Sequence, residues 1–92
     1  MSRDIRPSLR LRIFTPRSLL ADTDADEVTL PSLDGYLGVL PGHRRLFTAL
    51  GPGRVSYLSG NRGETFEIRG GYADVGPEAV VVFAEPSEDE TD

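Results

Sequence analysis

Cysteine and lysine are both missing from the sequence, and histidine occurs only once, at position 43. Without cysteine, the chain can form neither a disulfide framework nor a thiolate metal site. Without lysine, it cannot form the P-loop that binds phosphate, so the glycine-rich segment 51–53 is interpreted as a break between strands. A metal site at His43 would need carboxylates for every other ligand. The sequence therefore predicts no cofactor, no metal and no direct small-molecule ligand.

Long apolar runs are missing as well. The longest, Ala79–Ala84, is far short of the roughly 20 residues that a membrane-spanning helix needs. Residues 1–10 are polar and charged and do not resemble a signal sequence. Any attachment to a membrane is therefore expected to pass through a partner. Because no basic stripe with interleaved aromatic residues occurs, nucleic acid is not an expected ligand.

The residues that are present suit one small domain. The chain has 92 residues, of which 38% are hydrophobic and 27% charged. Ten glycines and seven prolines favour many turns and short strands over long helices. The net charge is −5, and the end of the sequence is mostly acidic or small and polar. We expect a flexible N-terminus over residues 1–8, a folded domain over 9–84 and a disordered acidic tail over 85–92.

Alternating apolar and polar residues predict strands along the whole folded part of the chain. In the first of them, Leu9, Leu11 and Ile13 alternate with arginines that are expected on the outer side. The last, 79–84, is apolar on both faces and is expected in the middle of a sheet. The predicted strands cover residues 9–14, 18–21, 27–30, 36–40, 43–50, 54–58, 64–69, 72–75 and 79–84. Many short strands with regular turns predict an all-β sandwich or barrel.

Two groups of polar residues could carry chemistry, and both are better explained without it. The acidic cluster Asp22, Asp24, Asp26 and Glu27 lacks the glycine and the distal glutamate of a calcium-binding EF-hand loop. It is interpreted as a solvated acidic turn. A serine hydrolase that uses His43 is formally possible, but no G-x-S-x-G elbow exposes a serine. The sequence therefore favours a non-enzymatic domain that contacts other proteins.

Several segments, taken in order along the chain, resemble the epsilon subunit of F-type ATP synthase. The most specific is D-G-Y-L-G-V-L-P-G-H at 34–43, which follows D-E-V-T-L-P at 26–31. Downstream, L-F-T-A-L-G-P-G at 46–53 and G-G-Y-A-D-V at 70–75 keep the order and approximate spacing of that family. The likeness spans residues 9–84, essentially the whole predicted domain.

The resemblance implies a ten-stranded β-sandwich, or flattened barrel, at the foot of a rotating central stalk. It implies contact with the gamma subunit on one side and with the membrane c-ring on the other. Through these contacts, ion-driven rotation would be coupled to ATP synthesis. No active site is implied, because catalysis takes place elsewhere in the complex. The expected location is the cytoplasmic face of the bacterial inner membrane, where the chain is attached only through the complex.

Matching the motifs residue by residue gives expected contact positions. The gamma-facing positions are Thr15, His43 and Thr48. The ring-facing positions are Asp34, Gly35, Tyr36, Leu37 and Gly38. Where the family often has an acidic or polar residue, Tyr36 offers apolar area and a hydroxyl donor. Arg44 and Arg45 stand where the family commonly has a small residue and a proline, and they could pair with acids on a partner or be solvated.

Family members usually continue with two helices that restrain ATP hydrolysis and, in some bacteria, bind ATP. Here the sequence ends eight residues after Ala84. We therefore expect a chain that transmits torque without inhibition by such a helical arm.

The alternative is a free-standing β-sandwich that binds an unrelated ligand such as a carbohydrate or a peptide. It would need an open sheet edge or an exposed aromatic platform. Tyr36, Tyr57 and Tyr72 are the candidates for such a platform. The ordered match along the chain favours the ATP synthase interpretation.

Overall fold

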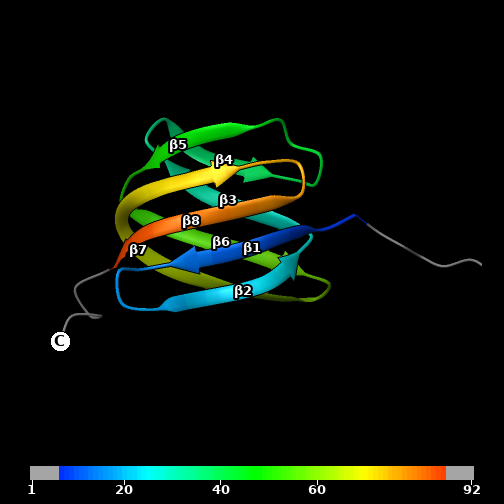
Figure 1. Cartoon of the computed structure of the whole chain (residues 1–92), viewed down its shortest axis with the longest axis horizontal. Helices are drawn as coiled ribbons and strands as arrows, with labels where there is room; N and C mark the ends of the chain where they lie inside the picture. Colours follow the sequence, from blue (N-terminus) through cyan, green and yellow to red (C-terminus); the bar gives the residue numbers. More distant parts are fainter. Residues whose placement is uncertain (1–6, 87–92) are drawn as a thin grey trace, which may run out of the picture.

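The computed structural model describes residues 7–86, and the regular structure in this part consists of β-strands (Figure 1). Over the same residues, no helix is long and apolar enough to cross a membrane. The strands are β1 (Leu9–Phe14), β2 (Leu19–Ala25), β3 (Glu27–Ser32), β4 (Gly35–Val39), β5 (Leu46–Leu50), β6 (Gly53–Ser59), β7 (Arg62–Val75) and β8 (Ala79–Pro86). The all-β prediction is confirmed. The predicted number of ten strands is wrong, since the described residues form eight.

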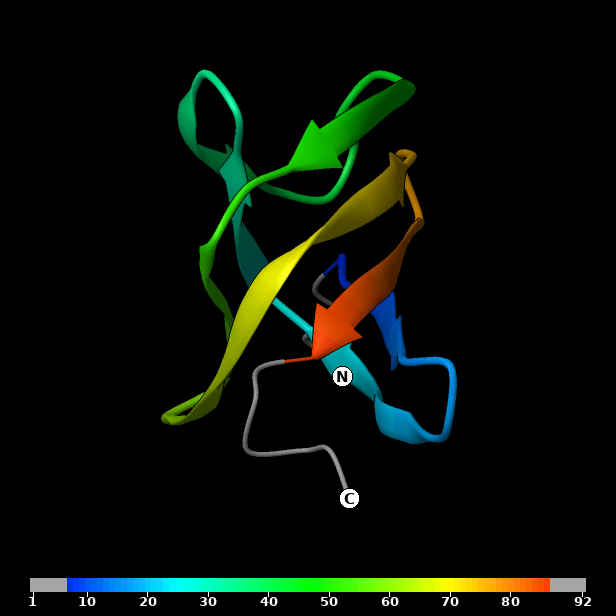
Figure 2. The ribbon, with the colours of Figure 1, turned by 90° about the vertical axis from the view of Figure 1, so that its left-hand side faces the viewer.

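The strands are arranged in two layers (Figures 1 and 2). The front sheet in Figure 1 has the order β2-β1-β8-β7-β5. The back sheet consists of β4, β3, β6 and the first half of β7. All neighbours are antiparallel except β1 and β8, which pair in parallel from Arg10–Ala79 to Phe14–Phe83. The first and last strands of the chain therefore lie side by side in the front sheet.

Strand β7 belongs to both layers. Residues 62–68 pair with β6 in the back sheet, and residues 70–75 pair with β8 and β5 in the front sheet. The change occurs at Gly70–Gly71, where Gly71 has a φ of 138° and the pairing with β8 shifts register. A Cβ at Gly71 would overlap the carbonyl oxygen of Phe83, so this bend requires glycine. The bend joins the two strands that the sequence predicted at 64–69 and 72–75.

The core lies between the two sheets and receives alternate residues from each strand. In β1, Leu9, Leu11 and Ile13 are buried while Arg10 and Arg12 are exposed, as the alternation predicts. The buried apolar residues are Leu9, Leu11, Ile13, Ala25, Val28, Leu30, Val39, Leu50, Val55, Ile68, Ala73, Val75, Val80, Val82 and Ala84. The same alternation leaves a second set of side chains on the outside of each sheet, where they do not contribute to the core.

The acidic residues after β1 form a strand, not the predicted turn. Asp22 and Asp24 are part of β2 and lie opposite Arg12 and Arg10 of β1. Arg10 makes ion pairs of 2.8 Å with Asp22 and 3.1 Å with Asp24. The hydrogen bond to Asp24 and the charge of Asp22 raise the pKa of the Arg10 guanidinium above its ordinary value. The arginines of β1 thus pair across the strands with the carboxylates of β2. These pairs stabilise an extended strand in a segment whose acidic residues by themselves would favour a loop.

Two other predicted boundaries also differ from the structure. Strand β8 lies between β1 and β7, as expected for an apolar strand in the middle of a sheet, and it extends to Pro86. The remainder of the expected acidic tail, 87–92, and most of the expected flexible N-terminus lie outside the described residues. The strand predicted at 43–50 is shorter in the structure, where β5 begins at Leu46.

Candidate protein-docking face

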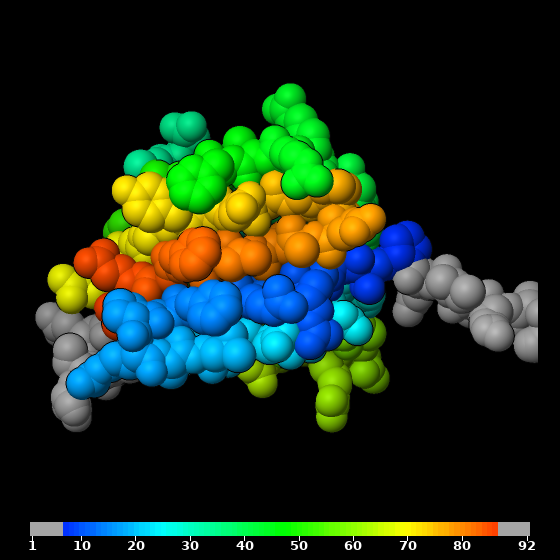
Figure 3. All heavy atoms as spheres, viewed as in Figure 1, coloured from blue at the N-terminus to red at the C-terminus, as the bar shows by residue number. Residues whose placement is uncertain are grey.

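Apolar side chains form a continuous row across the outside of the front sheet. Its members lie directly opposite one another in neighbouring strands: Leu19 with Phe14, Phe14 with Phe83, Phe83 with Tyr72, and Tyr72 with Ala49. We call these five residues the apolar row. Leu19, Tyr72 and Phe83 are 48%, 53% and 50% exposed. The row therefore crosses all five strands of the front sheet and faces solvent (Figure 3).

Stacked rings hold the row in place. Phe14 and Phe83 stack with ring centroids 6.0 Å apart, and Phe47 stacks on Tyr72 with centroids 5.6 Å apart. Phe47 comes from the next row along β5 and is 63% exposed. Rings that stack on their neighbours have little further freedom to lose when another surface covers them, so the apolar row is already ordered in the isolated chain.

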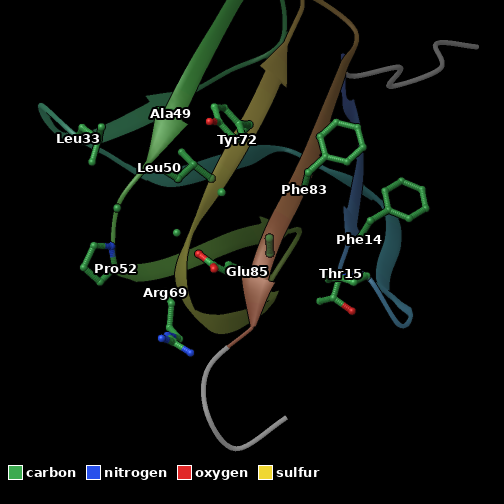
Figure 4. Close-up of a pocket in the computed structure, with 15 residues that line it drawn as sticks. Phe14, Thr15, Leu33, Ala49, Leu50, Pro52, Arg69, Tyr72, Phe83 and Glu85 are labelled. Atoms are coloured by element: carbon green, nitrogen blue, oxygen red, sulfur yellow. The ribbon is translucent and has the colours of Figure 1, made fainter. Parts of the chain in front are cut away.

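A hollow of about 770 Å³ opens along one side of the apolar row (Figure 4). Phe14 and Phe83 lie on one side of it, and Leu33 and Pro52 lie on the opposite side. Its charged lining residues are Arg69 and Glu85. A concave, mostly apolar surface with a few polar groups at its margin is typical of a binding site.

The outside of the back sheet is more polar than that of the front sheet. Thr29 of β3, Ser56 of β6 and Thr65 of β7 lie opposite one another and form a row of hydroxyl groups. In the neighbouring row, Arg54 lies opposite Glu67. We call this surface the hydroxyl face. It carries the composition expected of a β-sheet surface that remains in water.

The predicted gamma-facing residues lie in three separate places. Thr15 follows β1 beside the hollow, and its side chain is largely buried. Its Oγ1 accepts hydrogen bonds from the backbone N–H groups of Arg17 and Ser18, at 3.2 and 3.0 Å. The hydroxyl of Thr15 is therefore used within the turn between β1 and β2, while its position next to the apolar row keeps it within reach of a partner.

His43 and Thr48 lie elsewhere. His43 is in the loop between β4 and β5, at the opposite end of the sandwich from Thr15, and its Nδ1 is 2.6 Å from the carbonyl oxygen of Arg44. Thr48 lies opposite the fully buried Ala73, so its side chain is on the inner side of β5. The fold does not bring Thr15, His43 and Thr48 together as one cluster, and their role as contacts stays a prediction.

The predicted ring-facing residues include all but the last residue of β4, at the edge of the back sheet. Gly35, with a φ of 124°, forms the tight turn that begins after Ser32. Tyr36 is exposed, but its hydroxyl oxygen accepts a hydrogen bond of 3.1 Å from the backbone N–H of Arg54. A Cβ at Gly53 would lie 2.6 Å from this hydroxyl, so glycine there leaves room for the tyrosine. The side chain of Tyr36 thus links β4 to the start of β6.

Other sites considered from the sequence gain little from the structure. Within residues 7–86, no group of three or more histidine, aspartate or glutamate residues could hold a metal ion. The three tyrosines do not form a platform, because Tyr57 packs against the core and Tyr36 lies over the back sheet. Sequence reasoning missed the apolar row. The signal that could have found it is that Phe47, Tyr72 and Phe83 occupy the outward positions of strands whose inward positions are mostly apolar already.

These features define the class of protein: a two-layer, all-β domain with one apolar outer surface suited to a protein partner. A family model described as the beta-sandwich domain of the ATP synthase delta/epsilon chain matches residues 8–90. The chain belongs to this family.

Individual relatives agree with the family model. The chain is 42% identical over 81 residues to the ATP synthase epsilon chain of Synechococcus sp. (strain RCC307), covering 88% of this chain and 60% of the relative. The ATP synthase epsilon chain of Moorella thermoacetica is 38% identical over 82 residues, with 88% of this chain and 61% of the relative covered. The chain therefore spans about 60% of the length of the curated relatives it matches.

Solved structures share the fold. A chain in the Euglena gracilis mitochondrial ATP synthase, described as OSCP/F1/c-ring, superimposes with a TM-score of 0.81 at 22% identity, covering 100% of this chain and 61% of that one. A chain in the central stalk and c-ring of the Tetrahymena thermophila enzyme gives a TM-score of 0.69 at 17% identity, with 84% and 63% covered.

Proposed function

We propose that this chain is a non-catalytic subunit of the central stalk of an F-type ATP synthase, where it joins the gamma subunit to the c-ring and couples ion-driven rotation to ATP synthesis. Membership of the family and the assemblies named for the similar structures support this role. The observation that carries the proposal is the apolar row. An apolar surface this continuous favours a permanent partner over solvent. The chain would then be peripheral to the membrane, on the cytoplasmic face in a bacterium.

The gamma subunit is proposed to cover the apolar row. Phe83 and Tyr72 lie at its centre and are the expected anchors, since aromatic residues at the centre of an interface dominate its binding energy. Thr15 would contact gamma at the margin of the hollow. His43 and Thr48 complete the proposed gamma-facing set, as the motif match predicts.

The c-ring is proposed to contact the turn and edge strand formed by Asp34, Gly35, Tyr36, Leu37 and Gly38. Leu33, in the same turn, is 68% exposed and also lines the hollow. The proposed ring and gamma contacts are therefore adjacent, as a subunit that joins the two would require. A cysteine introduced at Asp34 should crosslink to the c-ring in membranes that contain the complex, whereas one introduced at Thr65 of the hydroxyl face should not.

Binding of the purified chain to the gamma subunit of the same ATP synthase tests the proposal. We expect a stoichiometric complex by calorimetry, and Phe83→Ser should weaken it by about 2 kcal/mol, roughly thirtyfold. Leu58→Ser is the matched control, because Leu58 is 51% exposed but lies in the back sheet, outside the apolar row. A folded chain that does not bind gamma at micromolar concentration would refute the proposal. Equal effects of the two substitutions would refute the assignment to the apolar row.

A further inference from the structure

The apolar row runs across the strands, and this direction restricts what can lie on it. Its members come from five neighbouring strands, in the order β2, β1, β8, β7 and β5. Four steps between strands at about 4.8 Å each give a length of about 19 Å. A helix rises about 1.5 Å per residue, so about 13 residues of helix would cover this length.

Polar groups border the apolar row on both sides. On one side the adjacent row contains Asp22, Arg12, Val81, Asp74 and Phe47, each lying opposite the next in a neighbouring strand. On the other side is the hollow, with Arg69 and Glu85 at its margin. Charged groups therefore flank the apolar row on both sides, at Arg12 and Asp74 on one side and across the hollow on the other, while Phe47 widens the apolar surface at the β5 end. The apolar stripe of an amphipathic helix has this form.

An added β-strand fits the apolar row poorly. A partner strand needs a free sheet edge, with unpaired backbone groups. Phe14, Phe83 and Tyr72 lie in β1, β8 and β7, and each of these strands has a hydrogen-bonded neighbour on both sides. Only side chains are available to a partner over most of the row.

We propose that the apolar row is covered by an amphipathic helix of the gamma subunit that lies across the strands, with about 13 residues spanning the row. This inference rests on the proposed function and specifies the form of the contact. The helix carries a cation on the side facing Asp74, because Asp74 makes no ion pair with any residue of the described chain. Arg12, in contrast, is already 3.5 Å from Asp22.

Crosslinking from the two ends of the row measures the conformation of the partner directly. The chain has no cysteine, so Leu19→Cys in β2 and Ala49→Cys in β5 each introduce a single labelling site. Each variant is labelled with a photoreactive maleimide, irradiated in complex with gamma, and the crosslinked gamma residues are identified by mass spectrometry. Thr29→Cys on the hydroxyl face is the control and should give no specific crosslink.

We expect the two sites to crosslink to one segment of gamma at positions about 13 residues apart, with neighbouring crosslinks spaced by three or four residues as on one side of a helix. An extended segment across the row would instead give a separation of about six residues. That separation, or crosslinks to two unrelated segments, would overturn the inference and leave the proposed function intact. Failure of gamma to bind the unmodified chain would overturn both.

Charge reversal tests the orientation of the helix. Asp74→Lys should slow association with gamma about tenfold at low salt, and the difference should shrink at high salt because the charge lies at the rim. Glu67→Lys makes the same change in charge on the hydroxyl face and should change the rate less than twofold. Equal rates for Asp74→Lys and the unmodified chain would overturn the placement of a cation opposite Asp74.

Discussion

The outer faces of the two sheets have the same backbone pattern but carry different kinds of side chain. On the front sheet, a row of apolar and mostly aromatic side chains crosses five strands, while the back sheet presents hydroxyl groups and the Arg54–Glu67 pair. In both sheets the outward residues alternate along the strands with residues of the same core. The packing of the core therefore does not explain the difference between the two faces. A contiguous exposed apolar surface on a small domain is typical of an interaction site. The contrast therefore separates the residues that fold the chain from the residues that we propose contact a partner.

The largest expected effect on stability comes from a substitution at the bend of β7, the strand that belongs to both sheets. Gly71→Ala should lower the free energy of unfolding by at least about 3 kcal/mol, because a Cβ there overlaps Phe83 and the φ is unfavourable. Gly38→Ala is the control, since its Cβ would meet no atom within 4 Å. Urea denaturation measures both. A loss for Gly71→Ala no greater than for Gly38→Ala would show that the bend tolerates side chains.

Removing the centre of the apolar row should affect association more than folding. The double variant Tyr72→Ser/Phe83→Ser should lose about 3 kcal/mol of binding to gamma and most of the fluorescence of a bound hydrophobic dye. A Ser56→Ala/Thr65→Ala variant of the hydroxyl face should change neither, which is checked by calorimetry and dye titration. Retained dye binding in the double variant would place the apolar surface elsewhere.

A buried hydroxyl and an exposed one should also differ in their effect on stability. Thr15→Val leaves the N–H groups of Arg17 and Ser18 without their side-chain acceptor and should cost about 1–2 kcal/mol of unfolding free energy. Thr65→Val on the hydroxyl face should stay within about 0.5 kcal/mol. Thermal unfolding of the two variants gives the comparison. If Thr15→Val unfolds like the unmodified chain, the threonine is free to act only at an interface.

The smallest effect is expected from two tyrosines, one on each face. Tyr36→Phe removes the acceptor of the Arg54 N–H and should cost about 0.5–1 kcal/mol, since the bond is exposed. Tyr72→Phe keeps the ring that stacks on Phe47 and should cost less than about 0.5 kcal/mol. Urea denaturation can resolve this order. A reversed order would mean that the hydroxyl of Tyr72 has a structural partner.

The sequence predicts the parts of this fold that depend on local pattern. Alternation in 9–14 correctly assigns the buried and exposed sides of β1, because that pattern reflects burial directly. The predictions fail where a distant partner decides. Asp22 and Asp24 extend as a strand because Arg10 and Arg12 lie opposite them, and the two strands predicted at 64–69 and 72–75 are one strand because β6, β8 and β5 pair along its whole length.

The candidate site was harder to predict for the same reason. Phe14, Phe47, Tyr72 and Phe83 are spread over most of the chain, and only the register of four strands brings them onto one surface. Motif matching instead selected Thr15, His43 and Thr48, which the fold keeps apart. Single positions can be carried over from a family pattern, but a surface depends on strand order and register, which local sequence does not encode.

The parallel pairing of β1 with β8 has a consequence for how the chain folds during synthesis. Arg10 pairs with Ala79, so β1 cannot gain its β8 neighbour until residues 79–83 have left the ribosome. Contacts this distant in sequence slow folding and expose unpaired strands while they wait. The hairpin of β6 and β7 is local and can form earlier. The back sheet is therefore expected to be assembled first, and the front sheet, with its apolar row, to appear only in the last step.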